Sequence, residues 1–200
     1  MTQETLRQRL RLERLQLPGA ARKTASERVC ERLAQLSVFR RARRVAAYHA
    51  VRGELDLAPL LQWVTAPAKH WYLPVIHPGR ERTMRFVPYD PAHEPALNRY
   101  GIPEPDPAAA PAIRPQDLDL VLLPLVAFDA EGRRIGMGAG YYDRAFQFLR
   151  THPRPTRPLL IGVGYSFQRV DKIEPQPWDV TLDCVVSANG LYGPLTKKER

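Results

Sequence analysis

The sequence has few cysteines and no long apolar segment, and each shortage excludes a class of protein. Only Cys30 and Cys184 are cysteines, and they lie far apart among apolar neighbours. Neither a disulfide framework nor a cysteine metal site is therefore expected. No apolar run reaches the ~20 residues that a membrane span needs, and the N-terminus has no apolar signal region. We expect a cytoplasmic protein that does not enter a membrane.

Several familiar functional motifs are also missing. The stretch from Gly132 to Gly140, here called the glycine loop, lacks the Gly-Lys-Ser/Thr of a Walker A motif. Its last glycines alternate as Gly-x-Gly-x-Gly, which differs from the dinucleotide fingerprint. No Ser/His/Asp or Cys/His motif is recognisable. Four of the histidines have no metal-ligand spacing: His70, His77, His93 and His152.

What the sequence does contain is a globular composition with a strongly positive balance. It is 44% hydrophobic and 26% charged, and its formal net charge is +9 at pH 7. Many arginines form two clusters: Arg7, Arg9, Arg11 and Arg14, then Arg40, Arg41, Arg43 and Arg44. Such clusters can bind nucleic acid, a membrane surface or a small polyanion, or can be solvated helix faces. The solvated face is the default interpretation.

Hydrophobic periodicity predicts alternating helices and strands. An amphipathic helix is expected over 4–17, and a capping box at 24–27 predicts the start of a second helix. Buried strands are expected at 45–49, 71–76, 85–89, 119–128, 159–165 and 184–186. This alternation predicts a single-domain α/β fold over residues 1–200, a three-layer sandwich with a mainly parallel, Rossmann-like sheet.

A proline-rich segment interrupts the alternation at about 91–117. Its seven prolines are Pro91, Pro95, Pro103, Pro105, Pro107, Pro111 and Pro115. Proline lacks a backbone N–H, so this segment is too rich in it for a helix or a central strand. The segment could link two domains, but each side alone resembles half of an α/β sheet. We therefore expect a surface excursion within one domain.

The glycine loop is the most informative part of the chain. It follows an apolar run that ends in Asp129, and it precedes 145–150, which can continue as a helix. A strand, a glycine-rich turn and a helix start commonly hold phosphate, because glycine lets backbone N–H groups approach an anion and the helix N-terminus is partly positive. Arg133, Arg134 and Arg144 add positive charge, and Asp143 is a carboxylate suited to magnesium bound to phosphates.

These residues also carry a family resemblance. The segment Pro124–Asp129, followed by the glycine loop and Tyr141-Tyr142-Asp143-Arg144, resembles the signature of 5-formyltetrahydrofolate cyclo-ligases. Weaker matches extend over nearly the whole chain: an N-terminal arginine helix, Gly53-Glu54-Leu55-Asp56, Tyr72-Leu73-Pro74-Val75, Gly162-Val163-Gly164-Tyr165 and Trp178-Asp179. The resemblance implies conversion of 5-formyltetrahydrofolate to 5,10-methenyltetrahydrofolate, with consumption of ATP and with Mg²⁺.

The resemblance also implies roles for individual residues. Nucleotide binding falls on Arg7, Arg134, Ile135, Gly136, Met137, Gly138, Ala139, Gly140, Tyr141 and Tyr142. Folate binding falls on His49, Glu54, Met137, Gly138, Ala139, Gly140 and Tyr141, and metal binding on Asp143 and Asp183. No general base is identified. The implied partner is a reduced folate, with or without a polyglutamate tail, bound by a monomer that takes neither nucleic acid nor membrane.

Several of these residues have alternative interpretations. On sequence alone Glu54 fits a surface turn and His49 a structural role, and Asp183 has an acid counterpart in only some relatives. Gln3 stands where the family often has lysine, so Arg7 or Arg9 is expected to carry more of the nucleotide contact. Two other functions remain open: an RNA-binding protein that uses the arginine clusters, although no aromatic RNA-recognition motif is found, and a different phosphate-binding enzyme on the same scaffold.

Overall fold

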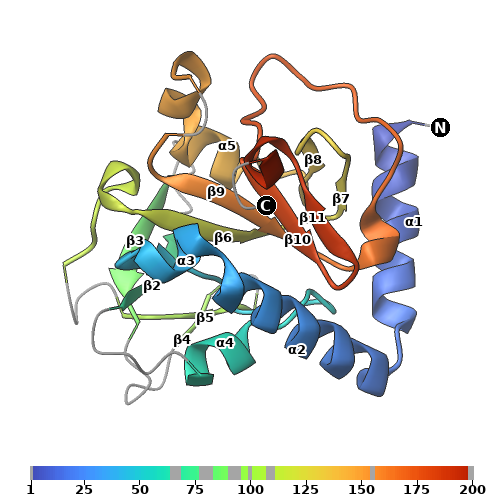
Figure 1. Ribbon diagram of the computed structural model, residues 1–200, viewed down its shortest axis with the longest axis horizontal. Helices are drawn as coiled ribbons and strands as arrows, with labels where there is room; N and C mark the ends of the chain where they lie inside the picture. Colours follow the sequence, from blue (N-terminus) through green and yellow to red (C-terminus); the bar gives the residue numbers. More distant parts are fainter. Residues whose placement is uncertain are drawn as a thin grey trace.

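The fold is built on a seven-stranded mixed sheet (Figure 1). The computed structural model describes residues 2–63, 69–76, 83–89, 96–98, 101–106, 111–153 and 156–197. The strand order is β11-β10-β9-β6-β1-β2-β3. The five strands from β10 to β2 pair in parallel, whereas β11 and β3 are antiparallel edge strands. The strands are β1 (Arg44–Ala46), β2 (His70–Ile76), β3 (Met84–Pro88), β6 (Leu120–Pro124), β9 (Leu159–Val163), β10 (Cys184–Ser187) and β11 (Gly190–Tyr192).

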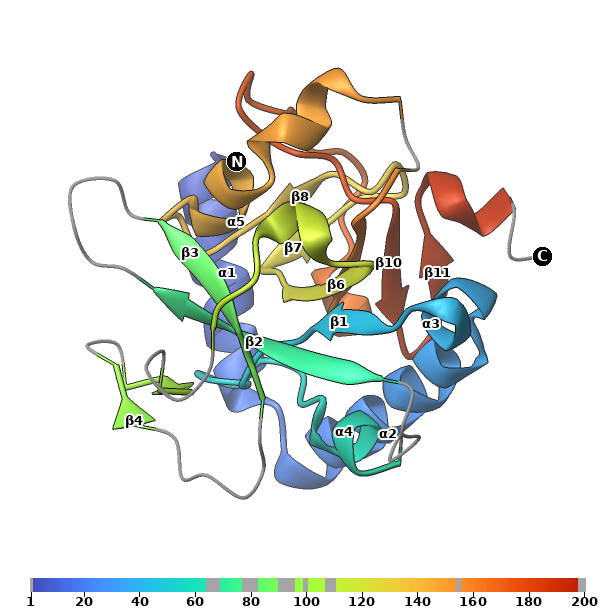
Figure 2. The ribbon, with the colours of Figure 1, turned by 90° about the vertical axis from the view of Figure 1, so that its left-hand side faces the viewer.

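Helices cover both faces of this sheet (Figure 2). One face packs against α2 (Gly19–Gln35), α3 (Ser37–Arg41) and α4 (Ala58–Trp63). The other face packs against α5 (Tyr141–Ala145) and the short 3₁₀ helix η2 (Gln147–Thr151). Successive residues of β1 divide between the two cores, because side chains of a strand alternate in direction. The predicted α/β sandwich with a mainly parallel sheet is confirmed.

The first helix, α1 (Gln3–Gln16), has a different place from the other helices. It stands at the side of the molecule and contacts a separate two-stranded sheet, formed by β7 (Ala127–Phe128) and β8 (Arg134–Ile135) (Figure 1). Leu10 is buried against Val126 and Ile135 in this small core. The helix thereby lies beside the glycine loop, which begins within this two-stranded sheet.

Several boundary predictions were wrong. The strands predicted over 45–49 and 159–165 end earlier, at Ala46 and Val163. The apolar run 119–128 is two strands, because β6 ends at Pro124 and β7 leaves the main sheet to pair with β8. The helix after the glycine loop ends at Ala145 instead of continuing to residue 150. The second helix begins at Gly19, after Pro18, so the predicted capping box at 24–27 lies inside it, where Lys23 and Glu27 approach to 4.0 Å.

The proline-rich excursion contains an ordered element. β4 (Ala96–Leu97) and β5 (Pro103–Glu104) form a two-stranded antiparallel sheet outside the main one. The Glu104 carboxylate accepts hydrogen bonds from the Asn98 side-chain amide, at 2.7 Å, and from the backbone N–H of Ile76, at 3.0 Å. This carboxylate fastens the excursion to the end of β2. Pro91, Pro95 and Pro107 lie outside the described residues.

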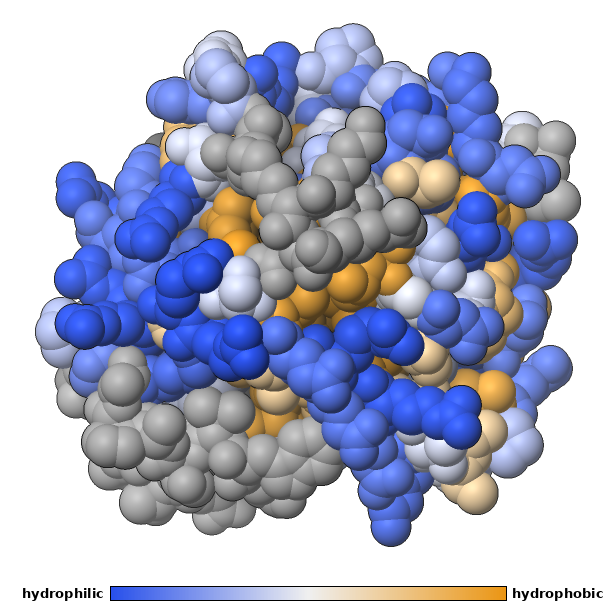
Figure 3. Space-filling model, viewed as in Figure 1, coloured by the Kyte–Doolittle hydropathy of each residue, from blue (hydrophilic) through white to orange (hydrophobic). Residues whose placement is uncertain are grey.

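The remaining 3₁₀ helices are η1 (Pro115–Asp117), η3 (Ser166–Gln168) and η4 (Pro194–Lys197). Among the described residues, hydrophilic side chains are the most frequent on the face that carries α2 and α3, and an apolar patch is visible near its centre (Figure 3). The second arginine cluster is solvent-exposed, which fits its default interpretation: Arg40, Arg41, Arg43 and Arg44.

Among the residues that the structure describes, no helix is both long enough and apolar enough to cross a membrane.

Candidate active site

A pocket with a volume of about 530 Å³ lies at the carboxyl ends of β1, β2 and β6. Ligands of parallel α/β sheets commonly bind at this edge. The walls come from α1, the segment after β1, the glycine loop with α5, β5 and residues 176–179. The predicted residues that line it are Arg7, His49, Glu54, Arg134, Ile135, Gly136, Met137, Gly138, Ala139, Gly140, Tyr141, Tyr142 and Asp143. The structure therefore gathers every predicted site residue except Asp183.

The glycine loop takes a shape that depends on its glycines. Gly138 and Gly140 have φ angles of +98° and +66°, in the region that side chains other than glycine rarely adopt. Arg7 reaches the loop from α1, since its Nε donates a hydrogen bond to the Gly136 carbonyl at 3.0 Å. A Cβ on Gly138 would stand 4.0 Å from the Arg7 guanidinium carbon. Arg7 and the loop therefore form one wall of the pocket, whereas the exposed Arg9 is not part of the lining.

Only one of the three predicted loop arginines lines the pocket. Arg133 turns away to the buried Asp129, with a nitrogen to oxygen distance of 3.2 Å. Arg144 donates a hydrogen bond to the Ala139 carbonyl at 2.7 Å and lies over the Tyr141 ring. These two arginines shape the loop from outside the cavity, which corrects the expectation that all three supply charge to one anion. Arg134 is the member that remains in the lining.

Asp143 and Arg134 face each other across the glycine loop. An Arg134 Nη2 donates to Asp143 Oδ1 at 2.6 Å, and the same oxygen accepts from the Val180 N–H at 3.2 Å. Arg134 also donates to the Val180 carbonyl. The Asp143 side chain keeps partial exposure at the pocket wall. An ion pair of this kind can separate when a phosphate and its metal ion bind. The arginine then pairs with the phosphate, and the carboxylate pairs with the metal ion.

The residues present fit magnesium only together with a phosphorylated ligand. Among the described residues, no group of three or more His, Cys, Asp or Glu side chains is placed to hold an ion. Mg²⁺ commonly uses one or two carboxylates plus phosphate oxygens and water, so a single carboxylate beside a phosphate-binding loop meets its usual requirement. Asp143 is the predicted metal ligand that lines the pocket.

Asp183 occupies a different environment from Asp143. Its side chain is buried, and Oδ2 accepts a hydrogen bond from the Leu160 N–H at 2.8 Å. It joins the start of β9 to the segment before β10 and is absent from the pocket lining. This position gives Asp183 a structural task and does not bring it to the predicted metal site.

Glu54 lies on a tight turn after β1. Arg52 and Gly53 have φ angles of +51° and +76°, which turn the chain so that Glu54 faces the pocket. The residue is only 9% exposed, and its Oε2 accepts a hydrogen bond from the Val51 N–H at 3.2 Å. Burial raises the pKa of this carboxyl, while the nearby Arg14 opposes that shift. A buried carboxylate in a cavity wall does not fit the surface-turn interpretation.

His49 and the two tyrosines supply flatter, less polar parts of the wall. Burial lowers the pKa of His49, so its imidazole is neutral near pH 7. Its ring lies edge-on to Tyr89, with centroids 5.9 Å apart. Tyr141 is buried, and Tyr142 stacks on Phe146 with an interplanar angle of 15°. Both tyrosines line the pocket, although adjacent helical residues point in different directions.

Sequence reasoning missed several charged residues in or near the pocket, among them Arg52, Glu104 and Arg14. Glu104 enters the lining from the proline-rich excursion, and no local pattern in the sequence indicates this. Arg14 is buried next to Glu54, at the end of α1. A signal for Arg14 did exist, because it continues the helical spacing of Leu6 and Leu10 and so falls on the apolar stripe. The solvated-face interpretation of the first arginine cluster is therefore wrong for Arg14.

A mainly parallel sheet with a glycine loop, a cation and carboxylates at its carboxyl edge is typical of α/β enzymes that act on phosphorylated ligands. The model of the 5-formyltetrahydrofolate cyclo-ligase family matches residues 1–188. The chain belongs to this family.

Individual relatives agree with this assignment. The 5-formyltetrahydrofolate cyclo-ligase of Escherichia coli K12 is 36% identical over 151 residues, covering 76% of this chain and 81% of the relative. The cyclo-ligase of Haemophilus influenzae is 31% identical over 179 residues, which cover 90% of this chain and 94% of the relative. The NMR structure of Aquifex aeolicus 5,10-methenyltetrahydrofolate synthetase superposes with a TM-score of 0.80 at 31% identity, covering 96% of this chain and 93% of that one.

Proposed function

We propose that this protein catalyses the ATP-dependent conversion of 5-formyltetrahydrofolate to 5,10-methenyltetrahydrofolate. Membership of the cyclo-ligase family supports this reaction. The observation that carries the proposal is the single pocket in which Glu54, the glycine loop and Asp143 meet. A folate and a nucleotide that share this cavity would have their reacting atoms next to each other, which is what transfer between two substrates demands.

The chemistry explains why the enzyme needs ATP. Ring closure requires N10 of the folate to attack the formyl carbon and expel the formyl oxygen, which is a poor leaving group. Transfer of the γ-phosphoryl group to that oxygen lets it leave as phosphate. The protein's task is then to place the two substrates and to balance negative charge around the transferred group.

The nucleotide side of the pocket consists of the glycine loop and its neighbours. Backbone N–H groups from Ile135 to Gly140 would face the phosphates, with positive charge from Arg7 and Arg134. Tyr141 or Tyr142 would lie against an aromatic ring of a ligand. Asp143 would hold Mg²⁺, which on binding neutralises phosphate charge.

The folate side of the pocket is the segment after β1. Glu54 would accept hydrogen bonds from N–H groups of the reduced pterin, and His49 would lie against the ligand as a neutral ring. Arg11 and Arg52 also line the pocket, and their charges suit the glutamate carboxylates of a folate tail. We assign Glu54 to the folate because its carboxylate would be repelled by the ATP phosphates unless a metal ion lay between them.

Turnover is the direct test of the proposed reaction. Purified protein with Mg²⁺, ATP and 5-formyltetrahydrofolate is expected to generate the near-ultraviolet absorption of the methenyl product, and omission of ATP should abolish it. Folded protein that forms no product would contradict the proposal. ATP consumption without methenyl product would instead indicate a different phosphoryl-transferring enzyme on this scaffold.

Substitution of Glu54 distinguishes the folate side from the nucleotide side. We expect Glu54→Gln to weaken 5-formyltetrahydrofolate binding about tenfold or more, since a hydrogen bond to a charged group contributes about 1.5–3 kcal/mol. Mg-ATP affinity should stay within about twofold, because Glu54 belongs to the segment after β1 and not to the glycine loop or α5, to which nucleotide binding is assigned. Calorimetric titration with each ligand separately measures both effects.

The exposed Glu31 on α2 provides the matched control, as Glu31→Gln removes the same charge far from the pocket lining. Loss of ATP affinity alone in the Glu54 variant would move this residue to the nucleotide side. Unchanged affinity for both ligands would remove it from the binding site.

A further inference from the structure

Arg14 is a buried cation that contacts residues of the pocket lining without belonging to the lining itself. It belongs to the last turn of α1, and its residue exposure is 2%. Burial lowers the pKa of Arg14, while Glu54 opposes this shift. Removing a guanidinium from water costs free energy unless its N–H groups find hydrogen-bond acceptors. The acceptors of Arg14 therefore indicate why this side chain is buried.

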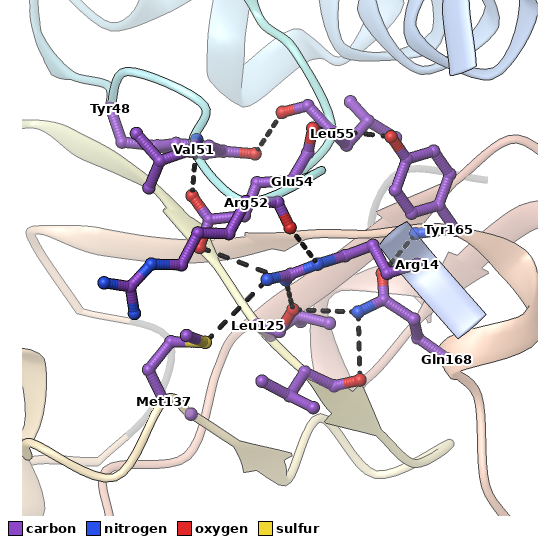
Figure 4. A network of polar contacts seen from close by, with 12 residues as sticks. Arg14, Tyr48, Val51, Arg52, Glu54, Leu55, Leu125, Met137, Tyr165 and Gln168 are labelled. Atoms are coloured by element: carbon purple, nitrogen blue, oxygen red, sulfur yellow. Dashed lines mark hydrogen bonds and ion pairs between the residues drawn. The ribbon is translucent and has the colours of Figure 1, made fainter. Parts of the chain in front are cut away.

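The guanidinium of Arg14 contacts three separate segments of the pocket (Figure 4). Its Nε donates to the Arg52 carbonyl at 3.2 Å, in the turn before Glu54. Nη1 donates to the Leu125 carbonyl at 3.4 Å, just after β6. Nη2 lies 3.9 Å from the Met137 sulfur, in the glycine loop. One rigid, planar group therefore joins the folate wall, the end of a central strand and the nucleotide loop.

The same guanidinium faces the Glu54 carboxylate. Arg14 Nη1 and Glu54 Oε1 are 3.9 Å apart, and both side chains are nearly inaccessible to solvent. The other carboxylate oxygen is held by the Val51 N–H. Arg52, from the same turn, also lowers the pKa of Glu54. Burial and the Glu54 charge raise the pKa values of three neighbouring tyrosines, Tyr48, Tyr142 and Tyr165, which stay neutral at pH 7. Arg14 is thus the main buried positive charge beside this carboxylate.

A second set of contacts fixes the acceptors of Arg14. The Leu125 carbonyl also accepts a hydrogen bond from the Gln168 side-chain amide at 2.9 Å. Tyr48 donates from its hydroxyl to the Leu55 carbonyl at 2.6 Å, which anchors the chain directly after Glu54. A Cβ on Gly53 would approach the Arg14 carbonyl to 3.1 Å, so α1 and the turn lie in close contact. The turn has little freedom to move relative to Arg14.

We propose that Arg14 is a positioning residue for the reaction: it holds the Glu54 carboxylate ionised and oriented toward the folate. This inference rests on the proposed function, in which Glu54 contacts folate. Arg14 touches neither substrate, since it is absent from the pocket lining.

The proposal gives the pH dependence a definite sign. Burial already raises the pKa of Glu54 above its usual value, so binding that needs the carboxylate is lost as pH falls through this raised pKa. Removal of the Arg14 charge takes away the largest of the effects that oppose this rise. The acid limb of kcat/KM for 5-formyltetrahydrofolate should therefore move to higher pH by about one unit or more in Arg14→Met.

Two further variants separate charge from shape. Arg14→Lys retains the positive charge but lacks the planar fork, so the acid limb should stay near its original pH while kcat/KM falls about tenfold. Arg14→Met/Glu54→Gln removes both members of the pair and leaves no unpaired buried charge, so it should fold even if Arg14→Met does not. Its kcat/KM should match that of Glu54→Gln within about threefold, because Arg14 acts through Glu54. Arg40→Met, at an exposed arginine of α3, is the matched control.

A titration that does not depend on turnover completes the test. In protein labelled with ¹³C at glutamate carboxyls, the Glu54 signal, assigned by its loss in Glu54→Gln, should titrate at higher pH in Arg14→Met than in the parent or in Arg14→Lys. An unchanged titration, or an Arg14→Met/Glu54→Gln variant at least tenfold less active than Glu54→Gln, would overturn the positioning role. A shifted titration in a protein that makes no methenyl product would support the Arg14–Glu54 coupling and contradict the proposed reaction alone.

Discussion

Replacement of Asp143 by asparagine is expected to lower turnover about 100-fold or more, the usual cost of deleting one preorganised charge from an active site. This corresponds to about 3 kcal/mol of transition-state stabilisation. The reason is that asparagine keeps the shape of the side chain but is a much weaker magnesium ligand than a carboxylate. Initial rates at saturating 5-formyltetrahydrofolate, measured over a range of Mg²⁺ concentrations, test this expectation, and excess Mg²⁺ should restore part of the lost activity.

The folded state should tolerate Asp143→Asn better than catalysis does. The amide oxygen can still accept from Arg134 and from the Val180 N–H, and Arg134 keeps its bond to the Val180 carbonyl. We expect a loss of about 1 kcal/mol in the free energy of unfolding, the difference between a charge-assisted and a neutral hydrogen bond. Asp171→Asn, at an exposed acid outside the pocket lining, is the control. Full activity of Asp143→Asn, or its failure to fold, would assign Asp143 to the fold instead of the metal.

Gly132→Ala is expected to cause the largest loss of stability among single substitutions in the glycine loop. Gly132 has a φ of +82°, and a Cβ there would stand 2.7 Å from the Leu182 carbonyl oxygen. That oxygen cannot move away easily, because the Leu182 N–H is bonded to the Gly132 carbonyl at 3.0 Å. Backbone strain and overpacking together should lower the free energy of unfolding by about 2–4 kcal/mol. For a domain of this size the melting temperature should fall by about 5–15 °C.

Gly19→Ala is the natural comparison for this substitution. Gly19 begins α2, and a Cβ there would meet no atom within 4 Å. Its melting temperature should stay the same or rise slightly, since alanine favours a helix over glycine. Thermal denaturation followed by circular dichroism measures both variants. Equal melting temperatures for the two would show that the Gly132 turn can relax and that its contact with Leu182 is not tightly constrained.

Much of the architecture could be predicted because most of it depends on local patterns. The apolar runs at β2, β3, β9 and β10 are long enough to identify buried strands, and the alternation with helices fixes the class of fold. The division of 119–128 could not be predicted in the same way. The run is almost wholly apolar from Leu120 to Phe128, and only the pairing of β7 with the following strand β8 shows that the chain leaves the main sheet after Pro124.

Part of the candidate site could also be predicted from the sequence. Asp143 and the glycine loop are close in sequence, and Glu54 follows a strand, so strand ends brought them together as expected. Arg133 and Arg144 look equivalent to Arg134 in the sequence, but Asp129 and the Ala139 carbonyl, respectively, bind them outside the cavity. Glu104 and residues 176–179 join the pocket only through tertiary contacts. The monomeric state and the cytoplasmic location stay predictions.

The strand order has a consequence for how the protein is made. β6 lies between β1 and β9, and its register pairs Leu120 with Val45 on one side and with Leu159 on the other. Both pairings close long loops, so the centre of the sheet forms late and the early half, β1 with β2 and β3, waits with an open edge. Residues 176–179, which complete the pocket wall, emerge later still. We therefore expect the edge of β1 that pairs with β6 to stay open during synthesis until β6 has been made, and the complete pocket to form only after residues 176–179.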